Sequence, residues 1–241
     1  MQTALITGTS GGIGLATAKA LNLRGINVVG LSRSSSGYTS PIFREITIDI
    51  TDTSALALCV RQLCKEYDFD ILINNAGAAY YGLHENLSAA MIHEIVSVNL
   101  EAPMIICSLM INRLKKNRGT IINISSATAK KSPNTHGAAY AASKAGLTSF
   151  SESLFAEVRK HGIRVVTLHP DMTDTGLYRN ADFTADPDYG CSLRPEDVAD
   201  AIVWAVSEPA GININDITIS PQYHSCLLYT SPSPRDTERS R

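Results

Sequence analysis

The sequence lacks a charge excess of either sign. Its 21 lysines and arginines nearly balance 23 aspartates and glutamates, which leaves a formal net charge of −2 at pH 7. Proteins that bind nucleic acid or an anionic membrane surface through their overall charge carry a clear basic excess. We therefore expect neither nucleic acid nor a membrane among the partners of this protein.

Long apolar runs are also missing. Hydrophobic residues make up 44% of the 241 residues, but no run approaches the ~20 residues that cross a bilayer as a helix. Met1 and Gln2 lead directly into Thr3–Ile6, without the charged and apolar regions of a secretory signal. The sequence therefore predicts a cytoplasmic protein.

Metal-binding spacings are absent as well. None of the five cysteines forms a Cys-x-x-Cys pair, and the six histidines are scattered singly. Clusters of these residues at short spacings are typical of metal sites. We therefore expect reduced, structural cysteines and no metal site.

Residues 226–241 differ from the rest of the chain. The run Cys226–Asp236 resembles the conceptual translation of a transposase-type sequencing-library adapter, and residues 237–241 would be read-through beyond it. We expect this tail to be non-native and residues 1–225 to form a single domain. A genuine polar, disordered tail is the alternative, and it leads to the same structural expectation.

Short apolar runs alternate with helical periodicity along residues 1–225, which predicts an α/β fold: a doubly wound, Rossmann-like parallel sheet of seven strands with helices on both faces. The expected strands are Thr3–Ile6, Asn27–Ser32, Ile46–Ile48, Ile71–Ile73, Thr120–Ile124, Arg164–Leu168 and Ile214–Ile219. The expected helices are Ile13–Leu23, Thr53–Glu66, Ser88–Asn117 with a bend at Pro103, Ala138–His161 and Pro195–Glu208. The irregular stretch at about 171–193 is a candidate substrate lid.

A glycine-rich loop, Gly8-x-x-x-Gly12-x-Gly14, joins the first strand to the first helix. Such glycines permit a tight turn, let the backbone approach a pyrophosphate, and let helix and strand pack closely. The helix N-terminus adds free N–H groups and a partial positive charge. The loop lacks the Gly-Lys-Ser/Thr ending of nucleotide-hydrolysing loops, so we expect a dinucleotide, contacted also by Ser10 and Ile13.

The end of the second strand distinguishes between dinucleotides. A carboxylate there binds the ribose hydroxyls of NAD, whereas a nearby arginine accommodates the 2′-phosphate of NADP. This sequence has Leu31-Ser32-Arg33-Ser34 and no acid. The guanidinium of Arg33 matches phosphate geometry, so we predict NADP(H) in preference to NAD(H). An exposed loop arginine without a ligand is the alternative.

Tyr140 and Lys144 lie four residues apart on an expected helix and therefore share a face. A nearby ammonium favours the phenolate and lowers a tyrosine pKa from its ordinary ~10. That chemistry moves a proton on and off an alcohol oxygen. Such pairs are common on solvated helix faces, so the spacing alone does not establish a site.

The motifs occur together in a recognisable order: Thr7-Gly8-x-x-x-Gly12-Ile13-Gly14, Asn74-Asn75-Ala76-Gly77, Val98-Asn99, Ser126, Tyr140-x-x-x-Lys144 and Pro170. On these residues the chain, from Met1 to about Pro221, resembles a compact short-chain dehydrogenase/reductase. The resemblance implies that Tyr140 is the general acid in carbonyl reduction and the base in the reverse direction, with its pKa lowered by Lys144. Ser126 would hydrogen-bond the substrate oxygen, and Asn99 would bend its helix and help hold a water near Lys144.

The resemblance also implies further cofactor contacts. Lys144 would hold the nicotinamide ribose, and the remaining contacts would come from loops at the strand ends. These are Asp49 and Ile50 at the adenine, Asn75, Ala76 and Gly77 near the adenosine ribose, and Pro170, Thr173 and Thr175 at the nicotinamide carboxamide.

The chain departs from the family pattern in two places. Asp171 follows Pro170 where the family has glycine, and this places the local loop geometry in question. Ser126 lies one residue further from Tyr140 than expected. We attribute this to one extra residue within 128–137, and Ser125 is the competing candidate for the serine.

These features predict an NADP(H)-dependent oxidoreductase that transfers a hydride between nicotinamide and a carbonyl or secondary alcohol. The alternative is a catalytically silent cofactor-binding regulator or scaffold on the same fold. The lid aromatics Tyr178, Phe183 and Tyr189 indicate a partly apolar small-molecule substrate. Because the long helices 88–117 and 138–161 have more apolar surface than one sheet face covers, and family members commonly pair through such helices, we expect a homodimer or homotetramer.

Overall fold

The computed structural model describes residues 1–130, 134–181, 183–188, 190–223 and 225–228. Its main sheet has the strand order β3-β2-β1-β4-β5-β6-β8, and every neighbouring pair is parallel. The strands are β1 Thr3–Thr7, β2 Asn27–Ser32, β3 Phe43–Thr47, β4 Ile71–Asn74, β5 Thr120–Ile124, β6 Arg164–Pro170 and β8 Asp216–Ile219. This confirms the predicted seven-stranded, Rossmann-like α/β fold.

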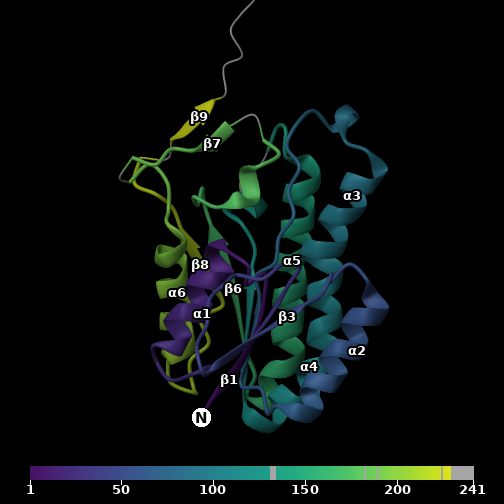
Figure 1. Cartoon of the computed structure of the whole chain (residues 1–241), viewed down its shortest axis with the longest axis vertical. Helices are drawn as coiled ribbons and strands as arrows, with labels where there is room; N and C mark the ends of the chain where they lie inside the picture. The colour runs from purple at the N-terminus through teal and green to yellow at the C-terminus, as the bar shows by residue number, and fades with distance from the viewer. Residues whose placement is uncertain (131–133, 182, 189, 224, 229–241) are drawn as a thin grey trace, which may run out of the picture.

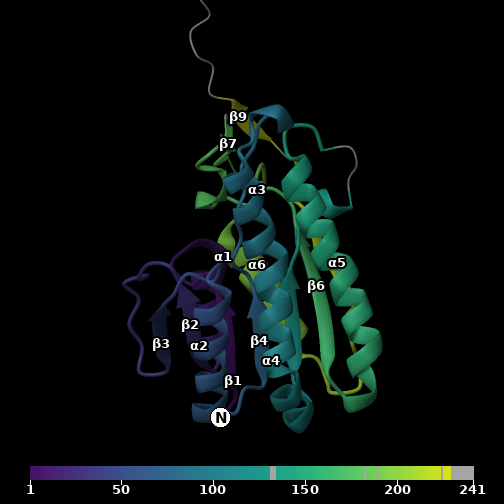
Figure 2. The same cartoon turned by 90° about the vertical axis from the view of Figure 1, so that its right-hand side faces the viewer.

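Helices cover both faces of the sheet, as Figures 1 and 2 show. Helices α1 (Gly12–Asn22) and α6 (Pro195–Ser207) lie on one face, and α2 (Thr53–Glu66), α4 (Ala102–Asn117) and α5 (Ala138–Val158) lie on the other. Successive residues of a strand point to opposite faces, so each strand contributes to two cores. In β1, Leu5 packs in the α2, α4 and α5 core, whereas Ala4 and Ile6 pack in the α1 and α6 core.

The first residues of two strands differ from expectation, and the ends of several strands differ by one or two residues. Strand β3 starts at Phe43, before the predicted Ile46, because it is an edge strand of exposed and half-buried residues without a continuous apolar run. Strand β8 starts at Asp216, later than the predicted Ile214, and its residues also alternate between exposed and half-buried. Edge strands carry weaker hydrophobic patterns than the buried strands between them.

The predicted helix Ser88–Asn117 is interrupted, but not by Pro103. Helix α3 (Ala89–Val96) passes into a π-helical turn, Ser97–Glu101, and α4 then begins at Ala102. Pro103 lies in the first turn of α4, where its missing N–H costs little. The irregular turn contains Asn99, and such turns often occur at functional sites.

The run Ala89–Asn117 is nevertheless one continuous stretch of helix. Its 29 residues make it long and apolar enough to cross a membrane, the only such helix within the described residues. Half of its most apolar window is buried inside the protein, where α4 packs against α2 and the sheet through Ile106 and Met110. This burial is typical of a core helix in a globular domain.

The lid contains more regular structure than expected. A short 3₁₀ turn covers Gly176–Tyr178, and β7 (Phe183–Ala185) pairs antiparallel with β9 (Cys226–Leu228). We expected no structure from Cys226 onward, but the backbone of these residues pairs with the lid whatever the origin of their codons. Residues Asp182 and Tyr189 of the lid, part of the 128–137 loop, and the tail 229–241 lie outside the described residues.

Candidate functional site

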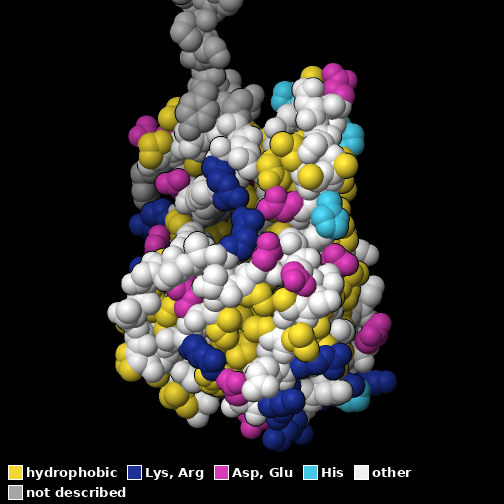
Figure 3. All heavy atoms as spheres, turned by 45° about the vertical axis from the view of Figure 1, so that its right-hand side comes forward, with side chains coloured by type: hydrophobic (Ala, Val, Ile, Leu, Met, Phe, Trp, Pro, Cys, Tyr) yellow, Lys and Arg dark blue, Asp and Glu magenta, His cyan; other side chains and the backbone are white. Residues whose placement is uncertain are grey.

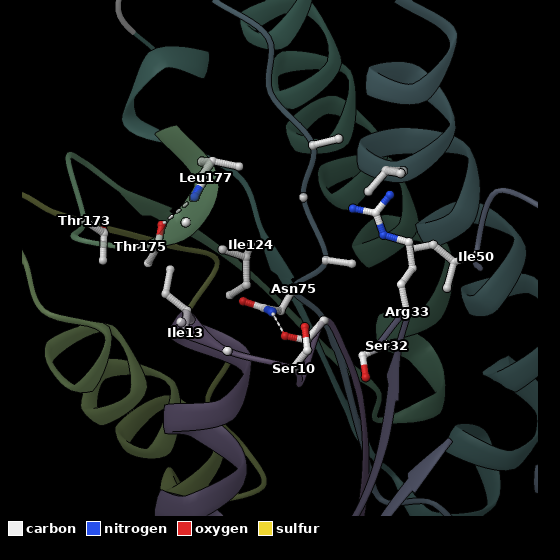
Figure 4. A pocket seen from close by; sticks show the side chains of 18 of the residues that line it. Ser10, Ile13, Ser32, Arg33, Ile50, Asn75, Ile124, Thr173, Thr175 and Leu177 are labelled. Atoms are coloured by element: carbon white, nitrogen blue, oxygen red, sulfur yellow. Dashed lines mark hydrogen bonds between the residues drawn. The ribbon is translucent and has the colours of Figure 1, made fainter. Parts of the chain in front are cut away.

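A pocket of about 360 Å³ opens at the carboxyl ends of β1 and β4. These strands are neighbours in the sheet, but the chain leaves β1 toward β2 and β3 on one side before it returns to β4 and β5 on the other. Ligands of open α/β sheets bind at such a switch point. All the predicted cofactor contacts except Gly14 line this pocket, and Figure 4 shows several of them: Gly8, Ser10, Gly12, Ile13, Arg33, Asp49, Ile50, Asn75, Ala76, Gly77, Tyr140, Lys144, Pro170, Thr173 and Thr175.

The glycine loop is shaped by close backbone contacts. Gly8 has φ +79° and its N–H donates to the Leu31 carbonyl at 2.7 Å. A Cβ on Gly14 would lie 2.2 Å from the Gly8 carbonyl oxygen, which explains why Gly14 shapes the loop without lining the pocket. Asn75 Nδ2 donates to the Thr7 and Gly8 carbonyls at 2.9 and 3.3 Å and so fixes the loop to the end of β4. The loop therefore lies at the start of α1, where the sequence predicts that a phosphate group binds.

Arg33 lies at the end of β2 beside the pocket and is half exposed. Its Nη1 is 3.0 Å from Glu94 Oε1 on α3, and the Tyr80 hydroxyl donates to Glu94 Oε2 at 2.6 Å. Nearby, Asp49 Oδ1 accepts hydrogen bonds from the Thr51 N–H and hydroxyl, which lower the pKa of Asp49. Sequence reasoning did not identify Glu94 as the partner of Arg33, because the two residues are 61 positions apart.

Tyr140 and Lys144 are both buried, on the face of α5 that lines the pocket. Lys144 Nζ donates to the Ile124 carbonyl oxygen at 2.7 Å and lies 5.9 Å from the centroid of the Tyr140 ring. The Ser126 hydroxyl is hydrogen-bonded to the Tyr140 side chain. The structure therefore places Tyr140, Lys144 and Ser126 together, as the motif spacing predicts.

The pKa of Tyr140 departs from expectation. Burial raises it, and the hydrogen bond with Ser126 only partly opposes that effect. Burial also lowers the pKa of Lys144 to about 8. The expected lowering of the tyrosine pKa by Lys144 is not found, because desolvation disfavours both charged groups and the ammonium donates to a backbone carbonyl.

The contacts of the two candidate serines differ. Ser125 Oγ donates to the Lys144 carbonyl and contacts Thr148 Oγ1, each at 3.0 Å, so its hydroxyl is directed toward the backbone and side chains of α5. Ser126 Oγ accepts from the Thr128 N–H and hydroxyl and reaches Tyr140. Ser125 lines the pocket, whereas Ser126 lies beside it, enclosed by Thr128 and Tyr140. The hydrogen-bond pattern supports Ser126 as the partner of Tyr140.

Asn99 is completely buried behind the pocket wall in the π-helical turn. Its Oδ1 accepts from the Ala78 N–H, and its Nδ2 donates to the Ala78 carbonyl and to Ser143 Oγ, all at 2.9–3.0 Å. Asn99 thus connects the segment after β4 with the turn of α5 between Tyr140 and Lys144.

The Pro170–Asp171 departure from the family pattern causes no backbone strain. Among the described residues other than glycine, positive φ occurs at Arg118 and His136 and not at Asp171. The Asp171 N–H donates to the Ile219 carbonyl, and its carboxylate accepts from the Met172 N–H and the Ser220 hydroxyl. A glycine is therefore not required at this position.

The lid contributes pocket residues that the sequence did not identify. Leu177 and Arg179 line the pocket together with Tyr178. The rings of Tyr178 and Phe183 both pack on Tyr81, and Tyr81 in turn packs on Tyr140 at 5.9 Å between centroids. Tyr81 follows the Asn74–Gly77 motif, but no sequence signal assigns it to the lid.

Metal ligands do not cluster in the parts of the chain that the structure describes: no three His, Cys, Asp or Glu side chains are grouped to hold an ion. All five cysteines are free. The polar side chains that line the pocket are hydroxyls, an amide, two arginines, a lysine and the carboxylates of Asp49 and Asp171.

Residues 2–185 match the family described as short chain dehydrogenase. The chain belongs to this family. It is therefore an oxidoreductase acting on CH–OH and C=O groups.

Individual relatives agree with this assignment. A probable NADP-dependent dehydrogenase of Haemophilus influenzae is 30% identical over 92% of this chain and 94% of its own length. The 3-oxoacyl-[acyl-carrier-protein] reductase of Escherichia coli is 31% identical over 86% of this chain and 90% of its own. A metagenomic short-chain oxidoreductase solved with NADP is 27% identical, with a TM-score of 0.76 over 91% of this chain and 96% of that one.

Proposed function

We propose that the protein is an NADP(H)-dependent oxidoreductase that interconverts a carbonyl compound and a secondary alcohol, with Tyr140 as the general acid/base. The observation that carries this proposal is the buried Tyr140 hydroxyl, which contacts Ser126 and shares one pocket with Lys144 and the glycine loop. The nicotinamide cofactor would supply the hydride. Gly8, Gly12, Asn75 and Thr175 would hold it at the strand ends.

The residues of the chain would manage the proton. Because burial raises the pKa of Tyr140, its hydroxyl keeps a proton at neutral pH and can donate it to a developing alkoxide. Ser126 would offer a second donor to the same oxygen. Lys144 would hold positive charge near the phenol as the proton leaves, and Asn99 would keep this part of α5 in position through Ser143.

Support for NADP(H) over NAD(H) comes from the end of β2. Arg33 lines the pocket there with Ser32 and Ser34, and residues 31–35 at the strand end include no acid. A guanidinium and hydroxyls match a 2′-phosphate better than they match free ribose hydroxyls. The names of one relative and one solved neighbour mention NADP, which supports NADP(H) as a cofactor.

The lid supports a partly apolar substrate. Tyr81, Tyr178 and Phe183 form an aromatic wall above Tyr140. Aromatic walls favour flat or apolar groups over strongly hydrated ones. We propose a small ketone, quinone or 3-oxoacyl compound within this class.

The test is NADPH oxidation against 2,3-butanedione, ethyl acetoacetate and 9,10-phenanthrenequinone, with NADH in parallel. We expect turnover of at least one compound, faster with NADPH, and a loss of about a hundred-fold or more in kcat for Tyr140→Phe. Tyr38→Phe is the matched control, because Tyr38 does not line the pocket. Tight NADPH binding without turnover of any compound would instead indicate a silent cofactor-binding protein.

A further inference from the structure

His169 is a buried titratable side chain that the proposed proton transfer does not use. It lies on β6, one residue before Pro170, and has no exposed surface. Its Nδ1 is 3.2 Å from the Ser126 carbonyl oxygen, and its Nε2 is 2.9 Å from Asp216 Oδ2 on β8. The ring therefore connects the turn after β5 with two neighbouring strands.

The chemistry of the neighbours determines the tautomer. A carbonyl oxygen only accepts hydrogen bonds, so the contact with Ser126 requires the proton on Nδ1. Nε2 has the distance of an ion pair to Asp216 but forms no aligned hydrogen bond. Both ring nitrogens therefore face acceptors, and Nδ1–H is directed at the Ser126 carbonyl.

Charged groups from the neighbouring elements also face His169. Asp216 Oδ1 binds the ammonium of Lys130, at the end of the turn after Ser126, and Lys130 also donates to Thr218 at 2.9 Å. The lysine therefore draws the carboxylate charge away from the imidazole. Burial lowers the pKa of His169, opposed by the Ser126 carbonyl and by Asp216.

The Ser126 peptide is held from two sides. Its carbonyl accepts from the Ala129 N–H at 3.0 Å as well as from His169, while the Ser125 N–H donates to the Leu168 carbonyl at 2.8 Å. The direction of this peptide determines where the Ser126 hydroxyl points. Without the ring, only the local turn would orient the serine that reaches Tyr140.

We propose that His169 is a positioning residue for the reaction. Its Nδ1–H donates to the Ser126 carbonyl and so keeps the Ser126 hydroxyl directed toward the Tyr140 hydroxyl. The proposal rests on the proposed function, because it acts through the role of Ser126 in that function. His169 itself contacts neither the pocket nor the reacting oxygen. Its effect should therefore appear in kcat rather than in the KM for NADPH.

Two substitutions distinguish the contributions of the two ring nitrogens. The side-chain amide of His169→Asn can place a donor near the Nδ1 position, whereas that of His169→Gln reaches toward the Nε2 position and loses the contact with Ser126. We expect His169→Gln to lower kcat for ethyl acetoacetate by about ten-fold with an unchanged KM for NADPH, and His169→Asn to lower it by about two-fold. Thermal midpoints of both variants control for folding.

A double-mutant cycle tests whether the effect passes through the serine. In a Ser126→Ala background, His169→Gln should cause little further loss of kcat. Additive losses in the cycle, or equal losses in the Asn and Gln variants, would overturn the proposal, since a purely structural role predicts both.

Hydrogen exchange supplies a measurement that needs no substrate. Amide exchange of residues 125–130, followed by mass spectrometry, should be faster in His169→Gln than in wild type and nearly unchanged in His169→Asn. Unchanged exchange in His169→Gln would refute the positioning contact itself. If no carbonyl compound is reduced by the wild type, the proposed function fails, and the exchange result still decides whether His169 holds the turn.

Discussion

Arg33 must exchange one partner for another if it binds a phosphate. In this structure its guanidinium pairs with Glu94, which also accepts from Tyr80. A charge-assisted contact with a 2′-phosphate contributes about 1.5–3 kcal/mol, equivalent to about 10- to 150-fold in affinity. Replacing Arg33 should therefore weaken NADPH binding and leave NADH binding nearly unchanged.

The measurement is the dissociation constant of each cofactor by fluorescence titration of Arg33→Ala. Arg24→Ala is the control, because Arg24 is exposed, lies outside the pocket and donates from its side chain to the Ala20 carbonyl of α1. Equal loss of affinity for both cofactors in Arg33→Ala would contradict the assigned contact with the 2′-phosphate.

The pKa of Lys144 determines the direction in which kcat/KM for carbonyl reduction should change with pH. Burial lowers its pKa from the ordinary value to about 8, so the ammonium is present below that pH and is lost as the pH rises through it. The pKa of Tyr140 is shifted upward, so the phenol keeps its proton over the same range. We expect kcat/KM for carbonyl reduction to fall above about pH 8.

The fall in kcat/KM above about pH 8 should be absent from the residual activity of Lys144→Met, measured over the same pH series with ethyl acetoacetate. A fall that persists unchanged in Lys144→Met would assign this pH dependence to another group. Binding of the cofactor can shift the midpoint in kcat, so kcat/KM, which reports free enzyme and substrate, is the quantity to compare.

In the β1–α1 loop, the need for glycine depends on how closely other atoms approach each position. A Cβ on Gly14 would meet the Gly8 carbonyl oxygen at 2.2 Å, whereas a Cβ on Gly11 meets nothing within 4 Å. Gly14→Ala should therefore displace the loop, cost about 1–3 kcal/mol of unfolding free energy, and weaken NADPH binding. Gly11→Ala, with an extended backbone at φ −179°, is the matched control for unfolding, because Gly11 itself lines the pocket.

Thermal unfolding and NADPH titration of the two variants measure these effects. The prediction is contradicted if Gly11→Ala and Gly14→Ala behave alike.

Elements fixed by local patterns were predictable. Buried strands such as β1 and β5 are continuous apolar runs, and the glycine loop follows a strand and opens a helix, so both could be placed from the sequence. The apolar pattern did not indicate the π-helical turn at Ser97–Glu101, because one irregular turn barely alters the helical period, and only the family resemblance implied a bend at Asn99.

Features that depend on distant partners were not predictable. The pairing of β7 with β9 joins segments far apart in the chain, and the contact of Arg33 with Glu94 does the same for two side chains. The direction of the Tyr140 pKa also depends on burial in the assembled fold, which residue spacing does not report.

At the scale of the whole molecule, apolar side chains remain exposed on the helical face. Val96 and Met104 are each 41% exposed on α3 and α4, and Figure 3 shows hydrophobic side chains gathered across the face that carries these helices. Exposed apolar patches of this kind favour association. We expect a homodimer or homotetramer, with a mass by light scattering that is a multiple of the 25.9 kDa chain.

Met104→Lys should shift the protein toward monomer, and Leu58→Lys, 71% exposed on α2, is the control. A monomer at micromolar concentration in the wild type would refute the expectation.

The pairing of β7 with β9 has a practical consequence for handling the protein. It joins the lid strand β7 to the last described residues of the chain. Met1 lies at the opposite end of the long axis of the molecule (Figures 1 and 2). A purification tag or fusion partner attached after residue 228 would pull directly on the segment that closes over the substrate. The same addition at the amino terminus would leave that segment undisturbed, so apparent substrate affinities from differently tagged preparations should differ according to which end was extended.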